Sequence, residues 1–284
     1  MRLIYYPPAF VLSRLYALAL SKRFRECNSS LINKIGVAGI VNIVKKQFFS
    51  PRRNGFYELF KQIIPAYFVK QCDVIFDVGA YIGRYTFCFS DIVGRNGKVF
   101  AYEPHPQIFS RLEKRCKRYS NISCRNFAVS KVSNQSVEMK IYPDATHECA
   151  TVEPILMGIE RMPGKTENIF VQTRKLDDHL NSIVPGSCGL IKIDVEGHEH
   201  AVIDGAANLI LRDSPIVIYE YGFVKGSFEP RTIVKMEQLG YVSYDCKTLD
   251  QVSDGYIVSG YTDLIAIPKT RQAEFEQLVL LLKS

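Results

Sequence analysis

The chain has 284 residues, of which 47% are hydrophobic, which suits one large domain with a well-buried core. No run of about 18 apolar residues occurs, so we expect no membrane-spanning helix. The formal net charge is +7, but residues 1–53 contribute +9 and the remainder balances at −2, a division that disfavours nucleic acid as a partner.

Residues 1–53 form a basic N-terminal extension in which apolar clusters, at 10–20 and 31–44, alternate with Lys and Arg. The pattern predicts helices and leaves two interpretations, a cap packed on the domain or helices lying on an anionic membrane surface. We favour the cap, because amphipathic helices usually serve packing, and keep peripheral membrane contact as the alternative. The eight cysteines form no CxxC pair, so we expect reduced thiols in a cytoplasmic protein.

Pro51 and Gly55 mark a boundary, so residues 54–284 are expected to form a single catalytic domain. Residues 143–167 are polar, carry Pro and Gly and show no clear period, which is typical of a substrate lid. Apolar patterns predict strands at 74–78, 98–102, 122–129, 136–142, 168–174, 190–195, 215–221, 241–246 and 264–267. Helical patterns cover 57–69, a segment after Gly83, 106–119, 198–212, 231–239 and 272–282. This alternation predicts an α/β fold with a doubly wound, largely parallel sheet, and we expect 136–142 and 168–174 to form an antiparallel pair.

The most informative segment is a strand, a glycine turn and a helix start between residues 74 and 86. Asp77 lies at the carboxyl end of the strand, and Gly79 and Gly83 bracket the turn. Such a turn brings backbone N–H groups and a helix N-terminus to the edge of the sheet where nucleotide-like ligands bind. The segment therefore predicts a cofactor site.

The spacing of this turn differs from that of a dinucleotide fingerprint, because Ala80 and Tyr81 stand where more glycine is expected. An acid before the glycines repels a pyrophosphate but suits a cationic ligand rich in hydroxyls. S-adenosylmethionine fits, since it carries an ammonium, a sulfonium and a ribose diol. Glu103 ends the next strand, 20 residues beyond Gly83, at the offset where a carboxylate can accept both ribose hydroxyls.

A second group of charged residues occurs at the end of the strand at 190–195. Lys192, Asp194 and Glu196 are expected on one face of this strand, and Gly197 permits a turn before His198. Asp194 can hold an acceptor hydroxyl or orient the methionine end of the cofactor, and His198 can serve as a general base. A plain ion pair between Lys192 and Asp194 is the alternative.

Three further interpretations concern the rim of the two sites. Asp194, Glu196 and His198 fit no standard ligand spacing, so no metal is expected. Glu220 is a candidate for the acceptor pocket, and His105 is expected at the rim of the cofactor pocket.

These segments also occur together, and in this order, in one known family. FDVGAYIGRYT (76–86), FAYEPHP (100–106), NFAVS (126–130), TRKLDDHL (173–180) and IKIDVEGHEHAVIDGA (191–206) resemble FkbM-type S-adenosylmethionine-dependent methyltransferases over about residues 56–268. The resemblance implies a Rossmann-like class I methyltransferase fold, with a seven-stranded, mostly parallel sheet and helices on both faces. The N-terminal extension lies outside it.

The resemblance also implies roles for residues and an activity, methylation of hydroxyl oxygens. Asp77, Gly79 and Gly83 would line the methionine portion of the cofactor, Glu103 the ribose, and 126–128 the adenine region. We assign nine residues in all to the cofactor site: Asp77, Gly79, Ala80, Gly83, Thr86, Glu103, Pro104, Asn126 and Ala128. His105 departs from the Asn that often follows Glu-Pro in the family.

We predict that the acceptor is a small molecule, a glycan or a lipid-linked sugar, and that its hydroxyl attacks the methyl group of the cofactor in line. Asp194 would position the acceptor, and Glu196 or His198 would accept its proton. Two alternatives remain, a nicotinamide-dependent sugar oxidoreductase and a non-catalytic nucleotide- or nucleic-acid-binding module.

Overall fold

The computed structural model describes residues 64–65, 67–141, 150–151, 167–224, 227–228, 231–258 and 260–283. The expected extension, its boundary and most of the expected lid therefore lie outside the described residues. Among the helices that the structure describes, none is long and apolar enough to cross a bilayer. The six cysteines in these segments are free thiols, in agreement with the expected reduced state.

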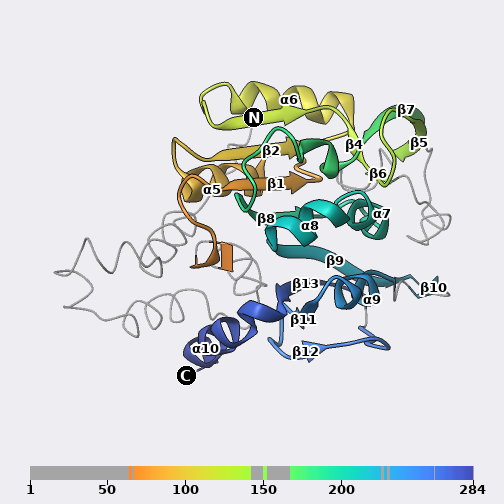
Figure 1. The fold of residues 1–284 in the computed structure, drawn as a ribbon. Coiled ribbons are helices and arrows are strands. Elements are labelled where there is room, and N and C mark those ends of the chain that lie inside the picture. Colours follow the sequence, from red (N-terminus) through yellow and green to blue (C-terminus); the bar gives the residue numbers. More distant parts are fainter. Residues whose placement is uncertain are drawn as a thin grey trace, which may run out of the picture.

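A large sheet forms the centre of the domain, in the order β12-β11-β13-β9-β8-β1-β2-β3, with β10 paired to β9 (Figure 1). Neighbouring strands from β3 to β9 are parallel, whereas β13 is antiparallel to both β9 and β11. Seven longer strands carry this order: β1 (Val74–Val78), β2 (Lys98–Tyr102), β3 (Ile122–Arg125), β8 (Cys188–Ile193), β9 (Ile216–Val224), β11 (Tyr241–Asp245) and β13 (Tyr261–Pro268). The expected Rossmann-like class I methyltransferase fold is confirmed, and two two-residue strands, β10 (Ser227–Phe228) and β12 (Gln251–Val252), extend its seven-stranded sheet.

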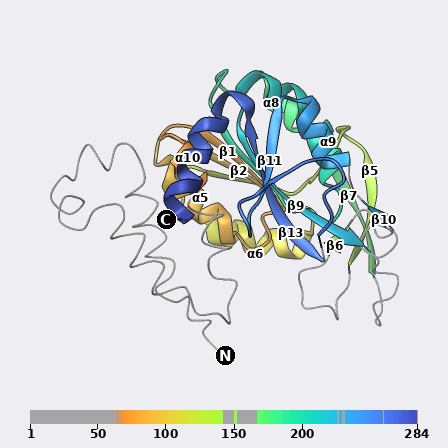
Figure 2. The same ribbon diagram turned by 90° about the horizontal axis from the view of Figure 1, so that it is seen from below.

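Helices cover both faces of this sheet, as the apolar patterns require (Figure 2). On one face lie α5 (Arg84–Val93), α6 (Pro106–Cys116) and α10 (Gln272–Lys283), and residues such as Phe89 and Phe275 pack on Ile75 and Leu190. On the other face lie α7 (Glu199–Asp204), α8 (Ala207–Asp213) and α9 (Arg231–Gln238). Strands buried on both sides are continuously apolar, so the charged residues at their ends stand out.

A smaller sheet, β4-β7-β5-β6, lies at one end of the large one (Figure 1). Its strands are β4 (Ala128–Val129), β5 (Ser136–Ile141), β6 (Ala150–Thr151) and β7 (Glu167–Arg174). β5 and β7 are antiparallel from Ser136↔Gln172 to Ile141↔Glu167, which confirms the expected pair. Two short 3-10 helices, η2 (Leu176–His179) and η3 (Lys269–Arg271), complete the described elements.

Two expected elements are each divided in the structure. The strand at 122–129 ends at Arg125, because the Asn126 side chain turns to bond the carbonyls of Glu103 and Pro104, and β4 then pairs with β7. The helix at 198–212 breaks at Gly205. The Asp177 N–H donates to the Gly205 carbonyl, and the Asp177 carboxylate accepts from the Leu209 N–H, so these groups no longer bond within one helix. The sequence pattern shows neither contact, since both partners are distant in the chain.

Candidate active site

Asp77 is fully buried near the carboxyl end of β1, where it lies beside Lys192 in the register of β1 and β8. Its Oδ2 accepts a hydrogen bond of 2.5 Å from the Thr86 hydroxyl on α5. Burial raises the pKa of Asp77, and the charge of Lys192 and the bond from Thr86 counteract that rise. Its Oδ1 is buried and accepts no hydrogen bond among the described residues.

The glycine turn leaves β1 in a conformation that only glycine adopts readily. Gly79 and Gly83 have φ of +74° and +89°, and the N–H groups of Gly79 and Ala80 both donate to the Tyr102 carbonyl. A Cβ on Gly79 would lie 1.7 Å from the Asp194 carbonyl oxygen. The backbone of the turn therefore touches the backbone of the second charged group.

Glu103 follows β2 and turns its carboxylate toward this turn, with a residue exposure of only 6%. One oxygen accepts from the Tyr81 N–H and the other from the His105 N–H, both at 2.9 Å. Burial raises the pKa of Glu103 to about 7, although the two N–H bonds favour the ionised form. Asn126 fixes the backbone of this segment by donating to the carbonyls of Glu103 and Pro104.

His105 has a structural contact beside this carboxylate. Its Nδ1 accepts from the Gln107 N–H and caps α6, whose first residue is Pro106. The side chain is buried and its pKa is lowered, mainly by that burial. Ala128, which the sequence assigns to the adenine region, is also buried, and it packs with Met139 and Val171 of the smaller sheet.

Lys192 connects the two groups of charged residues. Its Nζ lies 3.5 Å from Asp77 Oδ1 and 3.2 Å from Asp194 Oδ2, and it donates to the Gly79 carbonyl at 3.0 Å. The side chain is 8% exposed. The ion pair between Lys192 and Asp194, which the sequence left as the alternative interpretation, is thus present, and Lys192 also contacts the cofactor turn.

Three carboxylates gather beyond this lysine, those of Asp194, Glu196 and Glu220. One oxygen of each lies within 4.8 Å of the other two. Asp194 is 36% exposed, and Glu196 has a φ of +58° that turns its side chain out of the strand alternation. Glu220 comes from β9 and its pKa is raised well above the ordinary value, first by burial and then by Asp194 and Glu196. We name these three residues the acidic trio.

The histidine of this segment is oriented differently. His198 Nε2 lies 3.0 Å from the Ser130 hydroxyl. Among the described residues, His198 does not belong to the group of side chains whose ligand atoms lie within 4.8 Å of one another at Asp194. His200 lies in edge contact with His198. The structure therefore separates His198 from the acidic trio and adds Glu220 to it.

Sequence reasoning missed the contact of Glu199, which is buried at the start of α7 and accepts from the Val195 N–H at 3.0 Å. Burial raises its pKa to about 8. An acid in the first turn of an expected helix is too common a feature to have indicated this contact.

The turn fits a ligand that carries a cation and a diol. The buried Asp77 Oδ1 accepts no hydrogen bond among the described residues, and each Glu103 oxygen keeps a lone pair beyond its N–H bond. A Cβ at Gly79 would clash with the Asp194 carbonyl, so glycine is what lets these two backbone segments contact each other directly. The oxygens of the acidic trio are also of the type that hard cations prefer, although such acids often gather without an ion.

Comparison with known proteins agrees with this geometry. The family model "Methyltransferase FkbM domain" matches residues 77–243. The chain is 27% identical over 185 residues to hexuronic acid methyltransferase AglP of Haloferax volcanii, with 64% of this chain and 68% of AglP covered. It is 30% identical over 155 residues to 31-O-demethyl-FK506 methyltransferase FkbM of Streptomyces tacrolimicus, with 47% of this chain and 59% of that protein covered.

A solved FkbM methyltransferase from Methylobacillus flagellatus superimposes with a TM-score of 0.41 at 15% identity, covering 91% of this chain and 58% of that one. The family match spans more than half of the chain and includes the glycine turn, Glu103, Lys192 and the acidic trio. The chain therefore belongs to the FkbM family of methyltransferases, and its cofactor is S-adenosylmethionine.

Proposed function

We propose that this enzyme transfers a methyl group from S-adenosylmethionine to a hydroxyl oxygen of a sugar or a similar small acceptor. The observation that carries the proposal is the ion pairing of Lys192 with both Asp77 and Asp194, which sets the acidic trio directly beside the cofactor turn. The family match favours this reaction over nicotinamide-dependent oxidation and over binding without catalysis.

The cofactor site proposed from the sequence is a set of residues around the turn. Asp77, with Thr86 and the backbone at Gly79, Ala80 and Gly83, would hold the methionine portion. Glu103 and Pro104 would hold the ribose, and Asn126 and Ala128 would border the adenine. The sulfonium of the bound cofactor supplies a methyl group that is already activated, so the protein mainly aligns the acceptor and removes its proton.

On the acceptor side we assign positioning to Asp194, which is partly exposed and therefore accessible to a hydroxyl. The hydroxyl oxygen forms a bond to the methyl carbon as the bond to sulfur breaks, which gives an ether and S-adenosylhomocysteine. Glu220 or Glu196 would accept the hydroxyl proton. The raised pKa of Glu220 makes its ionised form a stronger base than an ordinary carboxylate. His198 is a weaker candidate than it was from the sequence, since its Nε2 contacts Ser130.

The acceptor class rests on the two curated relatives, whose names describe a hexuronic acid methyltransferase and a methyltransferase of 31-O-demethyl-FK506. One name gives a sugar acid as the acceptor, and the other gives an oxygen as the methylated atom. An oxygen of a sugar or similar small acceptor is the feature we carry over to this chain. The proposed place of action is the cytoplasm, with membrane contact through residues 1–53 as an open alternative.

The test is methyl transfer from S-adenosylmethionine labelled in its methyl group to a panel of glucuronides, neutral glycosides and alkyl amines. We expect label in an ether of a glycoside, identified by mass spectrometry and linkage analysis. Label on an amine would overturn the proposal. So would the absence of label on every glucuronide and glycoside while the cofactor binds normally. Asp194→Asn is the matched control, since it removes the acceptor carboxylate and preserves the shape of the side chain.

A further inference from the structure

A second polar pocket lies on the other face of the sheet from the cofactor turn. It is an open pocket with a volume of about 450 Å³, bordered by the ends of β2, β3 and β7 and by η2. Tyr102 contributes its side chain to the face that carries Phe76 and Phe100, whereas Asp77 and Lys192 face the opposite side. The pocket therefore lies on the opposite side of the sheet from Asp77, Lys192 and the glycine turn, whose N–H groups donate to the Tyr102 carbonyl. It shares only Phe127 with the stretch 126–128 that the sequence assigns to the adenine region.

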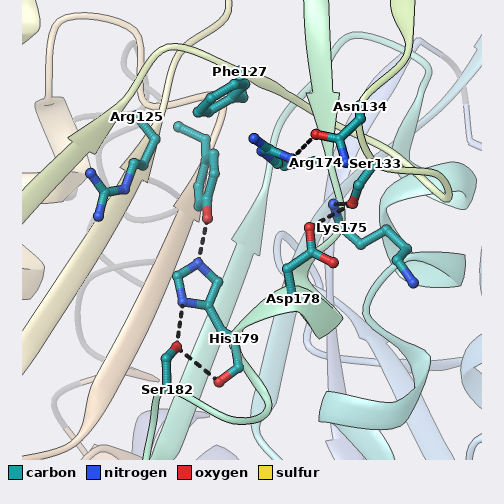
Figure 3. A pocket seen from close by; sticks show the side chains of 10 residues that line it. Arg125, Phe127, Ser133, Asn134, Arg174, Lys175, Asp178, His179 and Ser182 are labelled. Carbon is teal, nitrogen blue, oxygen red and sulfur yellow. Dashed lines mark hydrogen bonds between the residues drawn. The ribbon is translucent and has the colours of Figure 1, made fainter.

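The floor of this pocket is a fixed pair of polar groups. The Tyr102 hydroxyl lies 2.6 Å from His179 Nε2, and Ser182 Oγ lies 3.3 Å from His179 Nδ1 (Figure 3). The imidazole packs against Phe100 with ring centroids 4.3 Å apart. Burial, and then the charge of Arg125, lowers the pKa of His179, so the floor is uncharged and offers hydroxyl groups.

Three cations surround this floor. Arg174 lies over the Phe127 ring at 4.8 Å and donates to the Asn134 side chain, which holds its guanidinium in place. Arg125 and Lys175 lie on opposite sides of the Tyr102–His179 pair in the view of Figure 3. Arg125 is exposed at the rim, and within the described part of the chain no ion pair is found for the side chain of any of the three.

One acid borders the pocket among the residues that the structure describes. Asp178 accepts a hydrogen bond of 2.5 Å from the Ser133 hydroxyl, whose oxygen in turn accepts from the Lys175 N–H. Three cations against one acid leave an excess of two positive charges around this open pocket. An anion would offset this excess of charge, and guanidinium groups bind carboxylate or phosphate through paired hydrogen bonds.

We propose that this pocket binds the carboxylate or phosphate group of a sugar-sized ligand, with Arg125, Arg174 and Lys175 facing the anion. The volume lies within the range of small-molecule sites. The hydroxyls of Tyr102 and Ser182 can bond the hydroxyls of the sugar ring. This site is distinct from the proposed reaction and is tested without it.

Calorimetric titration of the full chain with glucuronate, glucose 6-phosphate and glucose tests the proposal. We expect at least one of the two anions to bind about tenfold more tightly than glucose, since hydrogen bonds to charged groups are the stronger ones. The tighter of the two anions identifies whether carboxylate or phosphate is preferred. Affinity should also fall as salt is added.

Two variants and a matched control locate the binding. Arg125→Gln and Lys175→Gln should each weaken anion binding by roughly tenfold, whereas Arg118→Gln, at an exposed position just after α6 that does not line the pocket, should leave the affinity unchanged. Urea midpoints equal to that of the wild type show that the variants are folded. Arg174→Lys, which keeps the charge but loses the paired donors, should also weaken binding.

Three results would overturn the proposal. These are binding of glucose as tight as that of the anions, no binding of either anion at about 10 mM, and a loss of affinity in Arg118→Gln as large as in the pocket variants. Continued methyl transfer with no anion binding would reject this pocket alone. Anion binding with no methyl transfer would leave it standing and count against the proposed reaction.

Discussion

The protonation of Glu103 should control the affinity of the cofactor in the neutral range. The carboxylate can accept both ribose hydroxyls only in its ionised form, because a proton converts one oxygen into a donor. Burial raises the pKa of this group to about 7. Cofactor binding should therefore strengthen as the pH rises through neutrality.

The size of this effect follows from the ionised fraction. With a pKa of about 7, roughly one-eleventh of the protein is ionised at about pH 6 and about three-quarters at about pH 7.5. If only the ionised form binds well, the dissociation constant should fall about eightfold between these values. The α-amino group of the cofactor titrates near pH 7.7–8.0, so this interval avoids most of its deprotonation.

Calorimetric titration with S-adenosylhomocysteine over this interval measures the effect, and Glu103→Gln is the control. The amide keeps one acceptor oxygen and has no proton to lose, so its affinity should be lower and should not vary with pH. A wild-type dissociation constant that is constant over the interval would refute the reasoning. A glutamine variant with the same pH dependence as the wild type would refute it as well, by showing that another group titrates.

Gly79→Ala places a Cβ 1.7 Å from the Asp194 carbonyl and should weaken cofactor binding at least about tenfold, whereas Gly186→Ala, at a similar positive φ with nothing within 4 Å, should cost only about 1–2 kcal/mol in urea unfolding. Equal cofactor affinities in the two variants would contradict the contact. Asp194→Asn should lower kcat by roughly 100-fold and leave the cofactor dissociation constant nearly unchanged, as measured by single-turnover assays and calorimetry; equal losses in both would place it on the cofactor side. His198→Ala should lower kcat less than about threefold, because its ring contacts Ser130, and a hundredfold loss would restore it as the base. Burial raises the pKa of Glu199 to about 8, above its ordinary value of 4.5, so its neutral form stabilises the fold fully below pH 4.5, and this contribution is lost as the pH rises through 8. The urea midpoint should fall over that interval, Glu199→Gln should reduce the fall, and an unchanged slope would rule out this group as its source.

The parts of the site that the sequence predicts well are local in the chain. A strand, an acid, a glycine turn and a helix start follow one another within residues 74–86. Each of these features is determined by residues next to it in the chain. Glu103 was found in the same way, from its offset after Gly83. The antiparallel pair of β5 and β7 follows from alternation alone.

The parts that could not be predicted depend on contacts between distant segments. Glu220 joins Asp194 because β9 lies beside β8, and the sequence gives neither the order of these strands nor the depth at which their ends lie. The break at Gly205 depends on Asp177, which precedes it by more than 25 residues. Buried contacts of this kind override the helical pattern, as they do wherever tertiary structure satisfies backbone groups in another way.

Lys192 shows why a charge is retained in a buried strand. An unpaired carboxylate at the depth of Asp77 would cost several kcal/mol, and the ammonium 3.5 Å away offsets that cost. The same ammonium lies 3.2 Å from Asp194 and bonds the Gly79 carbonyl, so it also fixes the position of the turn relative to the acidic trio. Because β1 and β8 are paired in register, Asp77 and Lys192 cannot move apart without breaking the sheet. Alignment of the two halves of the site is therefore a property of the sheet itself, and it exists before either ligand binds.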